Sequence, residues 1–199
     1  MRRASLLLVL SSACVTYVPA VRPTPAPCAD VPVPADVTVD WYEINGATSA
    51  ELRREMDVKG PVTDGKRNDA YTHWHVDWRY PFEKSAAGCT TGPTTITLKT
   101  SYQFPRWTGE ASGDEELRRR WHCYQGALLT HEDGHRVHGR DAAAEIEAKL
   151  PTLPPKRTCD EMDAAANAEG QRILQHYRDL DGQYDAKTNH GAAQGATFR

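Results

Sequence analysis

The chain has 199 residues, of which 26% are charged and 39% are hydrophobic, so it is long enough for one sizeable core and too polar for a membrane protein with several spans. Its 24 basic and 27 acidic residues give a formal net charge of −3. Because phosphate binding needs a clustered basic face, no nucleic-acid partner is expected. The sequence contains no repeat and no long low-complexity tract, which indicates an ordinary globular domain.

The first residues have the order of a secretory signal. A pair of arginines precedes an apolar run over residues 4–10, and small residues follow. The run is far shorter than the roughly 20 residues that cross a bilayer, so removal or lipidation is expected. Residues 1–13 are predicted to be a lipoprotein-type signal peptide that is cleaved before Cys14. Cleavage by ordinary signal peptidase after Ala20 is the alternative.

The cysteines indicate an oxidising compartment. They are Cys14, Cys28, Cys89, Cys123 and Cys159. Both processing routes leave four cysteines besides Cys14, an even number that can form two disulfides, and their pairing stays open because four cysteines allow three arrangements. Residues 14–35 are rich in proline and are predicted to be an extended tether, which a disulfide of Cys28 would fix to the domain. The protein is therefore expected in the periplasm or cell envelope as a lipoprotein, or secreted.

The folded domain is predicted to span residues 36–199 and to begin with a strand. Residues 37–44 are rich in β-branched and aromatic side chains, which favour strands. Thr48 and Glu51 have the spacing of a capping box, so a short helix is expected to start there and to run through about Met56.

Two segments with alternating polarity follow. Residues 71–80 place tryptophans on one face and charged or histidine side chains on the other, and residues 94–104 alternate in the same way. Pro105 is expected to end the second strand. Turn signals around Gly88 and Gly92 allow the two strands to pair antiparallel.

The second half of the domain is predicted to be helical. Residues 114–150 contain no proline, start with acidic side chains and carry apolar residues at helical spacing. A second capping box at Thr158 is expected to start a helix that reaches Leu180, and residues 181–199 are expected to be irregular. The predicted class is α+β, with a small, mostly antiparallel sheet packed on a long helix and on a second, C-terminal helix.

The long helix contains the motif His131-Glu-Asp-Gly-His135, which has the HExxH pattern. One helical turn separates the two histidines, so both imidazoles project from one face and can bind a single Zn²⁺ ion. Glu132 leaves the helix beside them, where its carboxylate can take a proton from zinc-bound water and pass it to a leaving group. The alternative is a helix that simply exposes two histidines.

A catalytic zinc usually has three protein ligands, so a third must come from elsewhere in the chain. His138 lies about 10.5 Å from His131 along an unbroken helix, which makes joint ligation strained, and a role beside the site or in solvent is favoured. The C-terminal segment offers Asp185 and His190. Metal ligation would explain why a segment with so few apolar side chains becomes ordered.

Aromatic motifs at residues 71–80 and 104–107 precede the HExxH helix, and the chain ends on the pattern YDxxTxHGxxQGA from Tyr184 to Ala196. Together these features resemble a bacterial family of predicted secreted zinc-dependent proteases, formally a domain of unknown function. The resemblance extends from about residue 37 to the C-terminus. HExxH is shared by many zincins, whereas its combination with this ending is specific.

The resemblance implies a zincin-like fold, in which a sheet packs on the HExxH helix and an edge strand borders the substrate cleft. An extended peptide could add to such an edge. The shared ending marks Asp185, Thr188 and His190 without telling which of them binds metal. His190 is ranked first as the third ligand because imidazole suits zinc, and Asp185 is ranked second. If His190 binds, Asp185 would orient one of the other histidines.

The expected function is that of an exported zinc metallopeptidase. One Zn²⁺ ion would be held by His131, His135 and His190, or by Asp185 in place of His190, with Glu132 as general base and then general acid. The expected partner is a peptide or protein substrate bound as an added edge strand. The only membrane contact would be a lipid anchor at the N-terminal cysteine.

Two other functions stay open at this point. The site can belong to a zinc hydrolase of a non-protein bond in the cell envelope, or to a non-catalytic envelope module whose metal is structural or absent. Glu132 argues against the module, because a structural site has no use for a carboxylate between its ligands. Tyr177 and Tyr184 are candidates to stabilise an oxyanion, with simple packing roles as the alternative.

Overall fold

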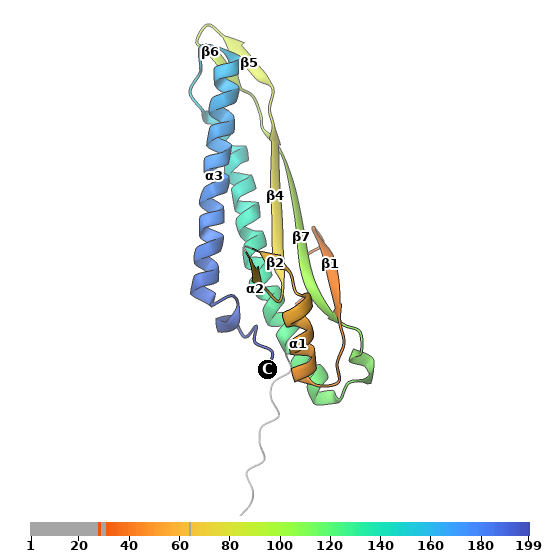
Figure 1. Cartoon of the computed structure of the whole chain (residues 1–199). Coiled ribbons are helices and arrows are strands. Elements are labelled where there is room, and N and C mark those ends of the chain that lie inside the picture. The colour runs from red at the N-terminus through yellow and green to blue at the C-terminus, as the bar shows by residue number, and fades with distance from the viewer. Residues whose placement is uncertain (1–27, 29–30, 64) are drawn as a thin grey trace, which may run out of the picture.

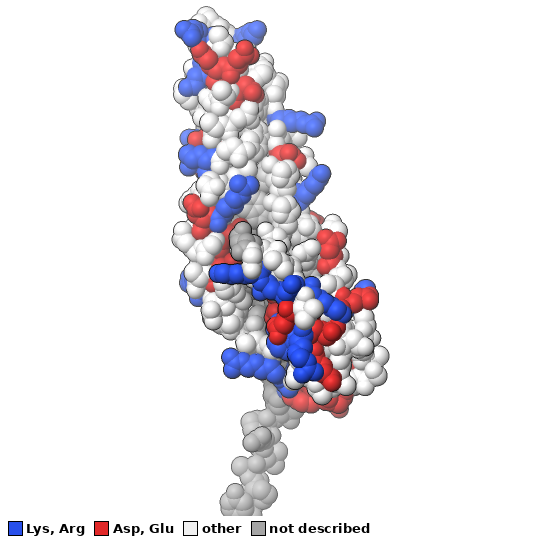
Figure 2. All heavy atoms as spheres, viewed as in Figure 1, with Lys and Arg blue, Asp and Glu red and all other residues white. Residues whose placement is uncertain are grey.

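The computed structural model describes residues 28, 31–63 and 65–199. The expected signal peptide, both of its cleavage sites (at Cys14 and Ala20) and most of the tether over residues 14–35 lie outside the described residues. None of the helices in the described ranges combines the length and apolarity that a membrane span needs. Figure 2 shows basic and acidic side chains interspersed over one face of the molecule.

The domain is elongated, with two long helices that run beside a three-stranded sheet (Figure 1). The strands are β1 (Val37–Ile44), β2 (Val62–Thr63), β3 (Lys66–Arg67), β4 (Tyr71–Arg79), β5 (Phe82–Ser85), β6 (Gly88–Thr91) and β7 (Thr95–Trp107). The helices are α1 (Ser49–Lys59), α2 (Glu115–Lys149) and α3 (Cys159–Thr188), with short 3₁₀ turns η1 (Glu110–Ser112), η2 (Leu150–Thr152) and η3 (Ala192–Gln194). This composition confirms the predicted α+β class.

The three-stranded sheet has the order β1-β7-β4, so β4 lies at one edge. β4 pairs with β7 antiparallel, as the turn signals predict, with Tyr71 opposite Gln103. β1 pairs with β7 in parallel, with Val37 opposite Thr100. This pairing was not expected, because it joins segments far apart in the chain and no local signal marks it. Two short antiparallel ribbons, β2–β3 and β5–β6, complete the strand pairing.

The expectation that Pro105 ends the second long strand is wrong, because β7 continues to Trp107. β4 pairs with β7 no farther than Gln103, so the missing N–H of Pro105 interrupts no pairing on that side. On the other side Pro105 lies opposite Tyr42 of β1. Its carbonyl oxygen accepts a hydrogen bond from the side-chain nitrogen of Gln125, at 3.1 Å.

The inward face of β4 packs its tryptophans against the two long helices. A Cβ atom at Gly139 of α2 would lie 2.7 Å from Trp74, and a Cβ atom at Gly170 of α3 would lie 2.6 Å from Trp78. Both helices therefore need glycine where an indole crosses them. The alternation predicted for β4 is confirmed, since Thr72 and the tryptophans point inward while the histidines of the strand are exposed.

α3 continues to Thr188, so the expectation of an irregular segment from residue 181 is wrong for residues 181–188. The hydrophobic pattern stops near Leu180 because the last two turns of α3 face polar side chains of α2 instead of an apolar core. The helix ends at Asn189, which has left-handed backbone geometry with φ of 50°. Beyond that point the chain forms only the η3 turn.

Two disulfides join distant parts of the chain, as the cysteine count predicts. Cys28 pairs with Cys123, and Cys89 pairs with Cys159. The first bond fixes residue 28, within the expected tether, to α2. The second bond fixes β6 to the first residue of α3, and Cys89 and Lys156 also exchange two backbone hydrogen bonds of 2.8 and 2.9 Å.

We predict that removal of the Cys89–Cys159 disulfide lowers the stability of the domain substantially. The bond joins residues that are 70 positions apart, so Cys89→Ala with Cys159→Ala frees a long loop in the unfolded chain and should cost about 2–5 kcal/mol of unfolding free energy. Urea unfolding followed by circular dichroism measures the change. An unchanged midpoint in the double variant would contradict the prediction.

Candidate metal centre

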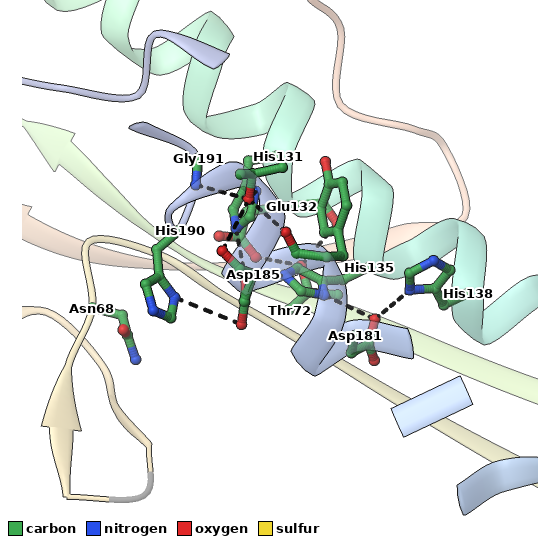
Figure 3. A network of polar contacts seen from close by, with 12 residues as sticks. Asn68, Thr72, His131, Glu132, His135, His138, Asp181, Asp185, His190 and Gly191 are labelled. Carbon is green, nitrogen blue, oxygen red and sulfur yellow. Dashed lines mark hydrogen bonds and ion pairs between the residues drawn. The ribbon is translucent and has the colours of Figure 1, made fainter. Parts of the chain in front are cut away.

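Three potential metal ligands converge where α2 passes the last turns of α3 (Figure 3). The Nε2 atoms of His131 and His135 lie 3.2 and 3.1 Å from Oδ1 of Asp185. The ligand atoms of the three residues all lie within 4.8 Å of one another. The helical spacing of HExxH brings the two histidines to one side of α2, and the unexpected extension of α3 brings Asp185 opposite them.

The cluster is buried on its histidine side and open at its carboxylate. The side chains of His131 and His135 are 5% and 12% exposed, whereas the side chain of Asp185 is 32% exposed. A ligand would therefore reach the cluster past Asp185. Two imidazole nitrogens and one carboxylate oxygen are a common donor set for zinc with an open fourth position.

Asp181 holds His135 from the other side of its ring. Oδ1 of Asp181 lies 2.9 Å from Nδ1 of His135 and 2.7 Å from Nδ1 of His138. Oδ2 of Asp181 accepts a hydrogen bond of 2.9 Å from the indole nitrogen of Trp74. His138 thus lies beside the site, and together with His135 and Asp181 it forms a second group of potential ligands that shares His135 with the first.

Tyr184 packs between the two histidines of the motif. Its ring stacks on His131 with a centroid distance of 5.1 Å, and it meets His135 edge-on at 5.2 Å. Its hydroxyl accepts a hydrogen bond of 2.9 Å from Gln194. The hydroxyl of Tyr177 lies 3.1 Å from a carboxylate oxygen of Glu145. Both tyrosines considered for oxyanion stabilisation therefore have packing or hydrogen-bonding roles in this structure.

Glu132 is almost completely buried, at 4% exposure, beside the two histidines. The hydroxyl of Thr72, on the edge strand β4, donates to its Oε2 at 2.7 Å. Burial raises the pKa of Glu132 above its ordinary value, while the hydrogen bond from Thr72 and the nearby histidines oppose this shift. A carboxylate with a raised pKa is suited to accept and return a proton near neutral pH.

The charges of the cluster are strongly coupled. Burial by itself lowers the pKa of His135, but its hydrogen bonds to Asp181 and Asp185 outweigh this effect and raise the pKa to about 10. Burial also tends to raise the pKa of Asp185, yet the two histidines hold it well below its usual range. The cluster therefore favours a positive charge between its ligand atoms, which a proton or a metal cation can supply.

His190 lies outside this group of ligand atoms. Its Nδ1 atom is 3.7 Å from Oδ2 of Asp185, and its side chain is 62% exposed. Its backbone has a positive φ of 50°, and its ring lies apart from the rings of His131 and His135 (Figure 3). The structure thus brings Asp185, the second-ranked candidate, together with His131 and His135, and it leaves the first-ranked candidate at the rim.

Asp181 and Gln194 are site residues that the sequence reasoning missed. A helix through residue 188 would have placed Asp181 one turn before Asp185 on the same face, so the missing signal was the length of α3. Gln194 belongs to the C-terminal motif, but only the fold shows that its Oε1 lies 3.0 Å from Nδ1 of His131.

The chain was compared with protein families, curated proteins and solved structures. Residues 39–191 match the family described as bacterial protein of unknown function (DUF922). The matched range contains His131, Glu132, His135 and Asp185. No curated protein and no solved structure matches the chain.

We predict that Gly134→Ala disturbs the centre without touching a ligand. A Cβ atom at Gly134 would lie 2.5 Å from Cζ of Tyr184, so the ring that stacks on His131 must move. The free energy of unfolding should fall by about 1–3 kcal/mol, as in other overpacked cores. Urea unfolding of the metal-free protein provides the measurement.

Gly182→Ala is the matched control, because it makes the same change on α3 where no atom lies within 4 Å of the added Cβ. It should leave stability unchanged or raise it by up to about 1 kcal/mol, owing to the higher helix propensity of alanine. Equal effects of the two substitutions would contradict the packing role of Tyr184.

Proposed function

The chain belongs to the bacterial family DUF922, whose function is unknown, and from the site we propose that it is a zinc-dependent metallopeptidase of zincin-like architecture. His131, His135 and Asp185 would hold one Zn²⁺ ion, and Glu132 would act as the general base. The observation that carries the proposal is the convergence of two imidazole Nε2 atoms on one carboxylate oxygen, with a buried glutamate beside them.

The donor set fits zinc in its orientation as well as in its composition. Nδ1 of His131 faces Oε1 of Gln194, and Nδ1 of His135 faces Oδ1 of Asp181. Metal-binding histidines usually donate from their second nitrogen to an acceptor of this kind, which directs the other nitrogen at the metal. We assign the third position to Asp185, because its oxygen already lies against both Nε2 atoms, and we place His190 at the rim.

The chain's own residues account for the proton transfers of peptide hydrolysis. Glu132 would take a proton from the attacking water and deliver it to the leaving amine, and the hydroxyl of Thr72 keeps the carboxylate in one orientation. When bound, zinc would polarise the scissile carbonyl and increase the acidity of a water molecule. The raised pKa of Glu132 supports both halves of this proton transfer.

The substrate is proposed to be a peptide or protein segment that adds to the edge of β4. A groove of about 280 Å³ lies between residues 74–78 of β4 and one face of α3. Side chains from both faces of β4 line it, so the groove follows the edge of the strand. Thr72 of the same strand contacts Glu132. An extended chain paired with this edge would thus lead to the general base.

The compartment is part of the same proposal. The two disulfides support an oxidising location such as the periplasm or the cell surface. Export through the N-terminal signal, with a lipid anchor at Cys14 or free secretion, remains the proposed route. No contact with nucleic acid is proposed.

We predict that zinc content depends on Asp185 and not on His190. The wild type should contain one zinc per chain, and Asp185→Ala should lose it, because one of three ligands is removed. His190→Gly should keep zinc, and glycine tolerates the positive φ at this position. Metal analysis after dialysis against a weak chelator measures the zinc content of the wild type and of both variants. Loss in His190→Gly with retention in Asp185→Ala would reverse the assignment.

We predict that Glu132→Gln separates metal binding from catalysis. The variant should keep its zinc and lose about 10²–10⁴-fold in kcat/KM, since it can no longer accept a proton. Mass spectrometry of peptides released from a denatured-protein library measures cleavage. A zinc-loaded wild type that cleaves no peptide would refute the peptidase proposal and point to a non-protein substrate or a binding module.

A further inference from the structure

The C-terminal residues 189–199, called here the C-terminal strap, lead back from α3 to α2. Gly191 and Gly195 have φ of 80° and 95°, and the turn between them is closed by a hydrogen bond of 3.0 Å from the Ala196 amide to the Gly191 carbonyl. A Cβ atom at Gly191 would lie 3.0 Å from Cγ of His131. The strap therefore passes directly over the first histidine of the motif.

The end of the strap is anchored in the aromatic core. Phe198 is 3% exposed, and its ring lies 5.4 Å from that of Trp121 and 5.2 Å from that of Tyr124, both on α2. The guanidinium of Arg120 lies over the same ring at 5.7 Å. Glycine turns at one end and a buried phenylalanine at the other thus fix the position of the residues between them.

Gln194 is the strap residue that contacts the centre. Its Oε1 atom lies 3.0 Å from Nδ1 of His131, and its Nε2 atom donates to the hydroxyl of Tyr184 at 2.9 Å. The hydroxyl of Thr188 is 3.4 Å from the same histidine nitrogen, but it donates to the Tyr184 carbonyl at 2.8 Å. Gln194 is therefore the nearer acceptor for the Nδ1 proton that His131 must carry when its Nε2 atom binds a metal.

We propose that Gln194 is the positioning residue of His131 and that the C-terminal strap is part of the metal centre. The inference rests on the proposed function in one respect, that His131 binds zinc. Gln194 would provide His131 with an amide oxygen as acceptor, whereas the carboxylate of Asp181 is the acceptor for His135. Gln194 lies just beyond the range that matches the family, so the match itself assigns it no role.

The test is the zinc affinity of the full-length protein, measured by competition with a chromophoric chelator. Gln194→Leu removes the acceptor at similar size and should weaken zinc binding about 10–100-fold. Gln194→Glu keeps an acceptor oxygen and should bind nearly as tightly as the wild type. Phe198→Ala loosens the strap and should therefore also weaken zinc binding, even though the Phe198 side chain lies in the aromatic core rather than at the metal centre. The absorption spectrum of the Co²⁺-loaded protein should change in the same two weakened variants.

Gln175→Leu is the matched control, because the exposed amide of Gln175 on α3 donates only to Asp179, at 2.8 Å, among the described contacts. Its zinc affinity should equal that of the wild type. Zinc binding by Gln194→Leu as tight as that of the wild type would overturn the inference. A wild type that binds zinc and cleaves no peptide would overturn the peptidase proposal alone, and a wild type without zinc affinity would overturn both.

Discussion

The centre depends on the register of two antiparallel helices. Four residues forward on α2, from His131 to His135, correspond to four residues back on α3, from Asp185 to Asp181, and each histidine meets a carboxylate at hydrogen-bonding distance. A shift of one residue would rotate the facing side chains by about 100° and separate these pairs. Buried polar groups are costly unless they are paired, so the rest of the fold must keep this register.

Contacts along the whole length of the two helices set this register. At the other end of α3, the Cys89–Cys159 disulfide and the backbone bridge of Cys89 to Lys156 fix the start of the helix to β6. Between the two ends of the domain, the indoles of β4 fit against glycines of α2 and α3. These contacts fix the position of both helices along the sheet. The same strand then supplies Thr72 to Glu132. Stability and the proposed chemistry thus depend on one packing arrangement.

Local signals predicted the elements that bury apolar side chains or carry caps. The strand of residues 37–44, the capping box at Thr48 and the long helix all follow from periodicity and capping chemistry. The length of α3 and the neighbour of β1 could not be predicted in this way. The last turns of α3 are ordered by polar contacts with another helix, and β1 pairs with a strand about 60 positions away. Ligand chemistry alone ranked His190 above Asp185, because imidazole suits zinc. The position of Asp185 against both histidines depends on the end of α3, which carries no hydrophobic pattern.

The proposed metal centre consists of two imidazoles, from His131 and His135, and the carboxylate of Asp185. X-ray absorption at the zinc edge of the loaded wild-type protein tests it most directly, because multiple scattering counts the imidazole rings. We expect two imidazole ligands together with oxygen ligands, at distances of about 2.0–2.2 Å from the zinc. A spectrum that requires three imidazoles would place His190 in the first coordination shell and contradict the role assigned to Asp185.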